Sequence, residues 1–147
     1  LIILDDYSMG LDAGYRRLFL DYLLYHVKNA GTTVLVTSHI VQDLERLVDD
    51  IIILDRHGVL VQSPLSEFAT TFRRYDFDVG DSEATVPLGR DQVVSNFDRV
   101  GDVVSVYSFD ELDRVREHVR QAGMDFRGVE AVSMSLEDAF IGMTGKY

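Results

Sequence analysis

The first part of the chain alternates short apolar runs with stretches whose apolar residues recur at helical spacing. Residues 1–4 are uninterruptedly apolar and stop at two acids, which is typical of a parallel strand buried on both faces. A second, β-branched run over 32–37 predicts another strand. Between them we expect a helix that Asp12 caps and Gly31 ends. Its predicted inward stripe is Tyr15, Leu18, Phe19, Tyr22, Leu23 and Val27.

The alternation continues beyond the second strand. We expect a short helix over 41–48, then a strand over 51–54 that turns back into a hairpin partner over 59–62. A helix from Pro64 to Phe72 follows. Strands that alternate with helices are typical of a parallel sheet with helical crossovers, so residues 1–72 are expected to be α/β.

The pattern changes after residue 72. Short alternating runs such as 75–79 and 103–107 predict half-exposed antiparallel strands, and another strand is expected near 126–132. Residues 108–111 have the composition of a capping box, which predicts a helix that ends at Gly123.

Ser135 and Asp138 predict the cap of a last helix. Two helices on a small antiparallel sheet make residues 73–147 a separate α+β domain.

Composition narrows the classes of function. The chain has 147 residues, no Cys and a formal net charge of -11, so disulfides and thiolate metal sites are excluded and nucleic acid is disfavoured as a partner. The longest apolar runs are far short of the ~20 residues that span a bilayer, and no basic-then-apolar leader opens the chain. The chain begins at Leu1, inside a strand-like run, so we expect it to be a piece of a longer polypeptide.

Candidate chemistry begins at the two acids after the first strand. Adjacent carboxylates at a strand end suit Mg²⁺, which prefers hard oxygen ligands, although such acids are more often solvated loop residues or helix caps. The order of the segments favours the functional interpretation. Asp5 and Asp6 close the strand, and residues 8–12 read Ser-Met-Gly-Leu-Asp. Residues 37–39 read Thr-Ser-His at the end of the second predicted strand, after the predicted crossover helix.

With these residues the sequence resembles the ATP-binding subunits of ABC transporters. Residues 1–6 are similar to the Walker B strand, 8–12 to the D-loop and 36–40 to the switch-histidine segment. The ending over 135–145 is similar to the close of an accessory domain of exporter-type members. The resemblance implies the C-terminal half of a P-loop ATPase parallel sheet with its helices over 1–72, followed by a small α+β accessory domain.

The resemblance also implies roles for four residues. Asp5 would hold Mg²⁺, and Asp6 would be the catalytic carboxylate that polarises the attacking water. His39 would be catalytic and cofactor-binding through the γ-phosphate of ATP. Asp12 would lie beside the nucleotide at the interface between two ATPase subunits. For Asp12 the alternative is a helix cap alone, and for His39 a plain polar residue at a strand end.

Two positions depart from the family pattern. The family places Glu followed by Pro where this chain has Asp6 and Tyr7. Asp is one methylene shorter than Glu, and general-base catalysis depends on the distance between the base and its water. Slow or relayed hydrolysis is therefore expected.

The phosphate cradle is missing from the sequence. A P-loop requires G-x-x-x-x-G-K-[ST], and the only Gly-Lys pair, residues 145–146, has Phe140 and Tyr147 in place of the required Gly and Ser or Thr. The resemblance places the signature motif and the Q-loop before Leu1. We expect that this chain alone neither binds ATP tightly nor hydrolyses it.

The main functional hypothesis is thus a fragment of an ABC ATPase subunit. In full-length form it would use ATP and Mg²⁺, pair with an identical or different second ATPase subunit and drive a transmembrane permease at the cytoplasmic face of the cell membrane. The accessory ending favours export. The alternative is that residues 73–147 form a dimerisation or regulatory module without nucleotide chemistry. A phosphoacceptor receiver domain is a third class, but it needs a Lys near its final strand, and the chain offers only Lys28 and Lys146.

Overall fold

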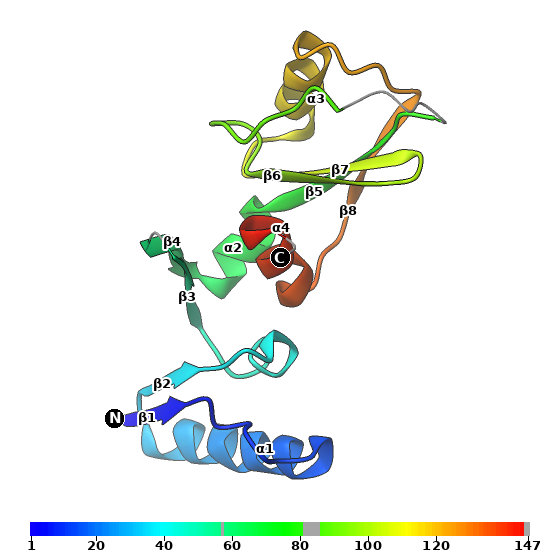
Figure 1. The fold of residues 1–147 in the computed structure, drawn as a ribbon. Coiled ribbons are helices and arrows are strands. Elements are labelled where there is room, and N and C mark those ends of the chain that lie inside the picture. Colours follow the sequence, from blue (N-terminus) through cyan, green and yellow to red (C-terminus); the bar gives the residue numbers. More distant parts are fainter. Residues whose placement is uncertain (57, 81–85, 146–147) are drawn as a thin grey trace. The chain divides into compact units, whose positions relative to one another are not determined.

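The protein divides into two compact units. The computed structural model describes residues 1–56, 58–80 and 86–145 (Figure 1). The first unit covers Leu1–Asp49 and the second Asp50–Tyr147. The domain boundary expected after residue 72 falls inside the second unit and stays a prediction. In the described residues no helix combines the length and apolar character needed to cross a membrane.

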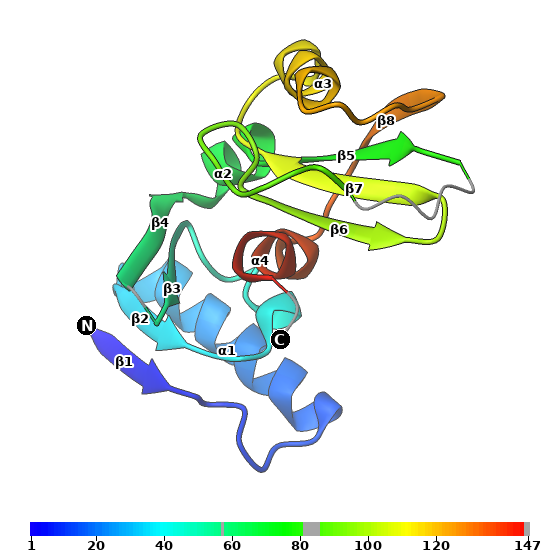
Figure 2. The ribbon, with the colours of Figure 1, turned by 45° about the horizontal axis from the view of Figure 1, so that its top comes forward.

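The first unit is a parallel strand pair joined by a helical crossover. β1 (Ile2–Asp5) pairs with β2 (Val34–Thr37), and the register runs from Ile2 opposite Val34 to Asp5 opposite Thr37. α1 (Ala13–Ala30) connects the two strands and lies along them in Figure 2. This arrangement confirms the α/β interpretation of the opening segments.

Both predicted ends of α1 are confirmed. Asp12 accepts hydrogen bonds from the backbone N–H groups of Gly14 and Tyr15 at 2.9 and 3.0 Å. Gly31 ends the helix at φ +57°, a left-handed conformation that glycine adopts without steric cost, and its N–H bonds to the carbonyl of Val27. These local rules are sufficient to place the helix.

The predicted inward stripe of α1 is wrong in part. Phe19, Leu23 and Val27 face inward, but Tyr15 and Tyr22 are 66% and 69% exposed, and Leu18 is also exposed. The apolar residues of this helix cover an arc wider than one face, and two strands cover only one side of it. The remaining apolar side chains therefore stay in contact with solvent.

The short helix expected over 41–48 is also wrong. Only a 3₁₀ turn, η1 (Val41–Asp43), forms there, and turns follow it. The carbonyl of Leu44 accepts from the N–H groups of both Leu47 and Val48, so the segment stays in tight turns rather than extending an α-helix.

The second unit begins with the predicted hairpin of β3 (Asp50–Asp55) and β4 (Gly58–Pro64), whose register shifts between Ile53 and Leu54. Three helices and four strands complete it. They are α2 (Leu65–Thr71), β5 (Arg73–Asp78), β6 (Asn96–Val100), β7 (Val103–Ser108), α3 (Leu112–Gln121), β8 (Gly128–Val132) and α4 (Leu136–Thr144).

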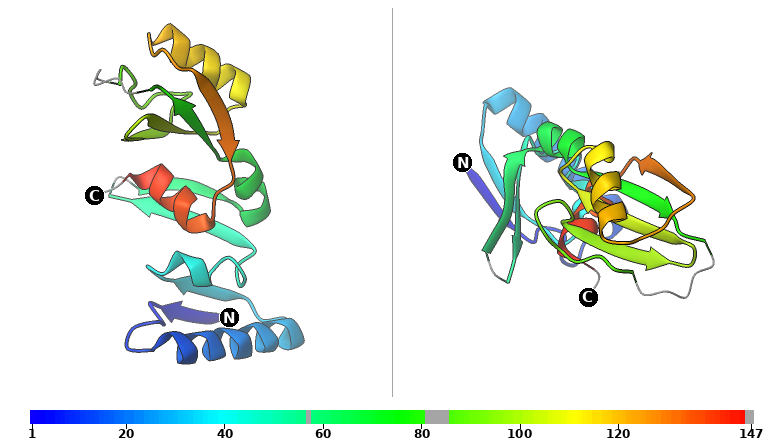
Figure 3. Two further views of the ribbon diagram at one scale, coloured as in Figure 1. Left: turned by 90° about the vertical axis from the view of Figure 1, so that its right-hand side faces the viewer. Right: turned by 90° about the horizontal axis from the view of Figure 1, so that it is seen from above.

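An antiparallel sheet in the order β6-β7-β5-β8 organises this unit. α3 lies on one face and α4 on the other (Figure 3). The half-exposed character predicted for 103–107 is wrong, because both faces of β7 are covered and its residues 104–108 are all buried. The core on the α3 side consists of Tyr75, Phe77, Val94, Val104, Val106, Val115, Val119 and Met124.

One of the two predicted capping boxes forms. Ser135 accepts from the N–H of Asp138 and its own N–H donates to the Asp138 carboxylate, which confirms the start of α4. The box over 108–111 is wrong: α3 begins at Leu112. The hydroxyl of Ser108, a fully buried residue, instead donates to the carbonyl of Val93. The same hydroxyl accepts from the N–H of Asp110, which precedes the helix, so it does not cap α3.

Close packing of α4 on β7 depends on Gly142. A Cβ atom added at this position would lie 2.3 Å from the ring of Tyr107, well inside van der Waals contact. We expect Gly142→Ala to lower the free energy of unfolding of this unit by about 1–3 kcal/mol through overpacking. Urea unfolding followed by resonances of the four-stranded sheet measures the change.

Gly89→Ala is the matched control, because an added Cβ there would meet nothing within 4 Å. The same unfolding midpoint for both variants would contradict the packing shown for α4.

Candidate active site

The candidate site lies where β1 and β2 end side by side. Because the strands are parallel, their register brings Asp5 opposite Thr37 at the carboxyl edge. The Thr37 hydroxyl donates to the Asp5 carboxylate and accepts from the backbone N–H of Asp6 at 3.1 Å. The same N–H also donates to the Thr37 carbonyl at 3.1 Å. One threonine thus fixes both acids relative to the second strand.

Asp6 occupies an unusual backbone conformation. Its φ of +44° is the only positive value at a non-glycine position among the described residues. Asp is one of the few residues that tolerate this region, and such conformations cluster at functional sites. Ser8, a buried residue, donates from its hydroxyl to the Asp6 carboxylate at 3.4 Å. The conformation turns the chain sharply after β1 and directs Asp6 away from the strand.

The predicted catalytic pair is brought together. His39 Nδ1 lies 2.9 Å from Asp6 Oδ1, although the two residues are 33 positions apart. A carboxylate only accepts hydrogen bonds, so the contact assigns the proton to Nδ1 and leaves Nε2 free for another partner. The imidazole is 69% exposed and the Asp6 side chain 33%, so both can reach a ligand from solvent.

The four predicted site residues do not form one cluster. Asp5, Asp6 and His39 meet at the ends of the two strands through Thr37, whereas Asp12 caps α1. Asp12 is therefore confirmed as the cap of α1, and its role at a subunit interface, which can coexist with capping, stays a prediction. Asp5 is exposed and carries hard oxygen ligands that suit Mg²⁺. Within the residues that the structure describes, no group of three or more His, Asp or Glu side chains could hold a metal ion.

Sequence reasoning missed the contacts of two residues near this site. Thr37 appeared only as part of a motif, yet it bonds to both acids. Tyr7 appeared as a departure from the family pattern, yet its ring stacks on Phe19 with centroids 5.4 Å apart. Burial, with a smaller contribution from the charge of Asp43, raises the pKa of the Tyr7 phenol. No spacing in the sequence signals these contacts.

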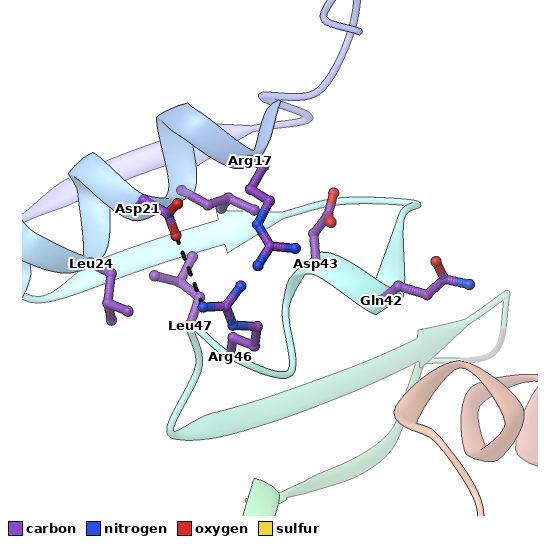
Figure 4. Close-up of a pocket in the computed structure, with 8 residues that line it drawn as sticks. Arg17, Asp21, Leu24, Gln42, Asp43, Arg46 and Leu47 are labelled. Atoms are coloured by element: carbon purple, nitrogen blue, oxygen red, sulfur yellow. Dashed lines mark ion pairs between the residues drawn. The ribbon is translucent and has the colours of Figure 1, made fainter. Parts of the chain in front are cut away.

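A small pocket of about 120 Å³ lies elsewhere in the first unit (Figure 4). Its charged side chains balance in sign, and one pair, Arg46 and Asp21, lies 4.0 Å apart. None of Asp5, Asp6 and His39 contributes to it, so the pocket is separate from the strand-end site. Its lining consists of Arg17, Leu20, Asp21, Leu24, Gln42, Asp43, Arg46 and Leu47.

Comparison with known proteins gives relatives of one kind. "Uncharacterized ABC transporter ATP-binding protein YhcH" of Bacillus subtilis (strain 168) is 28% identical over 148 residues, which cover 99% of this chain and 48% of that protein. The bacitracin transport ATP-binding protein BcrA of Bacillus licheniformis is 26% identical over 99% of this chain and 49% of its own length. The thiamine import ATP-binding protein ThiQ of Jannaschia sp. (strain CCS1) is 34% identical over 44% of this chain and 28% of its own length. No protein-family model matches.

The acids and the histidine lie at the carboxyl ends of paired parallel strands, where open α/β sheets bind their ligands. Over nearly its whole length the chain is homologous to ABC transporter ATP-binding proteins. This confirms the resemblance seen in the motifs. The chain spans about half the length of the relatives that it matches along its whole length.

The capping contribution of Asp12 can be measured separately from its charge. Asp12→Ala removes the acceptor for two N–H groups and should lower the opening free energy of the α1 amides by about 1 kcal/mol. Asp12→Asn keeps an acceptor of similar capping strength and should leave that free energy unchanged. Amide hydrogen exchange along α1 measures both. An equal loss in both variants would contradict the capping geometry.

Proposed function

We propose that residues 1–49 carry the hydrolytic half of an ATP site in an ABC transporter ATPase subunit. The observation that supports this most strongly is the contact between Asp6 and His39 at the ends of two paired parallel strands. It joins two segments that the family resemblance had assigned independently to one reaction. The rest of the site, including the phosphate cradle, would come from a longer polypeptide.

In this proposal Asp5 holds Mg²⁺, directly or through water. Its exposed carboxylate is oriented by the Thr37 hydroxyl, which uses one carboxylate oxygen. Mg²⁺ usually keeps several waters and binds through one or two carboxylates together with substrate phosphates, so a single well-placed Asp fits the ion. When bound, the ion offsets charge on the β- and γ-phosphates.

Asp6 and His39 act as a unit on the water and the terminal phosphate. The contact at 2.9 Å occupies Nδ1 and leaves Nε2 of this exposed imidazole to bond to a γ-phosphate oxygen or to the attacking water. An imidazole extends further than the Asp6 carboxylate, so it offsets only part of the reach that Asp lacks relative to Glu. This favours relayed hydrolysis, in which Asp6 positions His39 and His39 contacts the water.

The whole protein would bind MgATP between two ATPase subunits, with Asp12 near the interface, and drive a transmembrane permease from the cytoplasmic side. Relatives named for bacitracin transport and thiamine import support a transport role without fixing the substrate. The accessory ending favours export. The sequence motifs that cradle phosphates are missing from this chain. We therefore expect the chain on its own not to hydrolyse ATP.

A second candidate concerns the end of the chain. The four-stranded sheet with α3 encloses a core of its own, whose buried members lie within residues 75–124 and against which Phe126 and Val129 also pack. A self-contained core favours a separate module that mediates dimerisation or regulation. Expressing residues 73–147 alone and measuring folding and self-association tests this candidate, and an unfolded or strictly monomeric product would argue against dimerisation.

ATP turnover by the longer polypeptide tests the main proposal. Asp6→Glu should raise turnover, because it restores the longer carboxylate that the family uses. His39→Ala should lower turnover by about 10²–10⁴-fold, the usual contribution of a group that moves or positions a proton. His26→Ala, at an exposed position on α1, is the control and should change little. The 147-residue chain alone should show no turnover.

Unchanged turnover in both His39→Ala and Asp6→Glu would contradict the assignment of this pair. Micromolar ATP binding or measurable turnover by the 147-residue chain would contradict the proposal that its phosphate cradle lies elsewhere.

A further inference from the structure

A polar pocket of about 180 Å³ lies in the second unit, between β6 and the end of α4. Two of its side chains, Asn96 and Asp98, share one face of β6, because they are two positions apart along the strand. The pocket is smaller than the roughly 300–1,000 Å³ that encloses a drug-sized ligand, so it suits a small molecule. Its lining includes Arg90, Asn96, Asp98, Tyr107, Ile141 and Gly145.

Arg90 is held in this pocket by a buried side chain. Its Nε donates to the amide oxygen of Asn96 at 3.2 Å, and Asn96 is only 8% exposed. A guanidinium carries five N–H donors, so this contact leaves the terminal NH₂ groups for another acceptor. Among the described residues no acid forms an ion pair with Arg90, whereas Arg74 of the same sheet face binds Asp76 through two hydrogen bonds. The pocket therefore contains an oriented cation that no described carboxylate contacts.

Gly145, the residue that ends α4, leaves the space that the guanidinium occupies. A Cβ atom added at this position would lie 2.8 Å from Arg90 Nη2, which is closer than Cβ atoms approach their neighbours in proteins. The φ of Gly145 is +89°, in a region that glycine adopts without steric cost. Asn96 and Gly145 thus place Arg90 in two independent ways, since one bonds to the guanidinium and the other admits it.

The charges of the pocket select the chemistry of its ligand. Guanidinium donors match the oxygens of a carboxylate or of a phosphate. Asp98 adds a negative charge to the lining, which repels a dianionic phosphate and attracts an ammonium group. A small molecule that carries both a carboxylate and an ammonium group complements Arg90 and Asp98 together.

We propose that this pocket binds a free α-amino acid with a small side chain, with its carboxylate on Arg90 and its ammonium group on Asp98. Tyr107 and Ile141 complete the lining with apolar surface for the side chain of the ligand. The site lies in the second unit and uses none of the strand-end residues, so it does not depend on the proposed ATPase function. It adds a ligand-binding function to the end of the chain.

Titration of the 147-residue chain with L-alanine, followed by NMR, tests the proposal. The Arg90 Nε–H resonance and the side-chain NH₂ resonances of Asn96 should shift and saturate. Arg90→Gln should weaken binding about tenfold or more, because it removes the charged donors of the carboxylate. Gly145→Ala should also weaken binding, since the added Cβ displaces the guanidinium.

Two analogues of alanine separate the contributions of its charged groups. Propionate keeps the carboxylate without the ammonium group, and alaninamide keeps the ammonium group without the carboxylate. Each should bind about tenfold or more weakly than alanine, because each leaves one charge of the pocket without its partner. Asp98→Asn should remove the preference for alanine over propionate.

Arg114→Gln is the matched control, because Arg114 lies on α3 in an ion pair with Asp110 and does not line the pocket. It should leave the affinity for alanine unchanged.

Three results would each overturn the proposal. They are the absence of saturable shifts with alanine, an unchanged affinity in Arg90→Gln, and equal affinities for alanine and propionate. Tighter binding of inorganic phosphate than of alanine would overturn it as well. No nucleotide enters these titrations, so their outcome is separate from the turnover measurements that test the ATPase function.

Discussion

The parallel pairing of β1 with β2 is the constraint on which the site depends. Register places Asp5 opposite Thr37, and the next residues on both strands leave the sheet at the same edge. Asp6 and His39 can meet there only in this register of β1 against β2, because a slip of one residue between the strands would turn every side chain of one strand to the opposite face. The α1 crossover fixes the parallel direction, so a helix with no catalytic side chain on its inner face determines the geometry of the site.

Two kinds of restraint act on the residue after the first acid. From the sheet, Thr37 bonds to the Asp6 N–H, and from α1 the ring of Phe19 stacks on the ring of Tyr7, the next residue. A strained backbone persists only where its surroundings over-determine it. Where the family has a rigid proline, this chain therefore has an aromatic ring that packs against α1.

Local signals in the sequence were sufficient for much of the fold and less of the site. The caps Asp12 and Ser135 act within their own turns, so their sequence patterns placed α1 and α4 correctly. Ser108 has the same pattern, but its buried hydroxyl donates to the carbonyl of Val93. Val93 is fifteen positions away, which is too far for a rule based on neighbouring residues to include. Asp6 and His39 were predictable because their motifs carry family information, whereas the stacking of Tyr7 on Phe19 is a tertiary contact between two segments.

The position of the proton on the His39 ring tests the convergence of the two strand ends most directly. A two-bond ¹H–¹⁵N correlation spectrum of the chain at a pH where the ring is neutral distinguishes the two tautomers. The structure predicts the form protonated at Nδ1, since this nitrogen donates to the Asp6 carboxylate, while the exposed His26 provides the reference for an unconstrained ring. A His39 ring protonated at Nε2, with the same pattern in Asp6→Asn, would contradict the convergence of the two strand ends on one site.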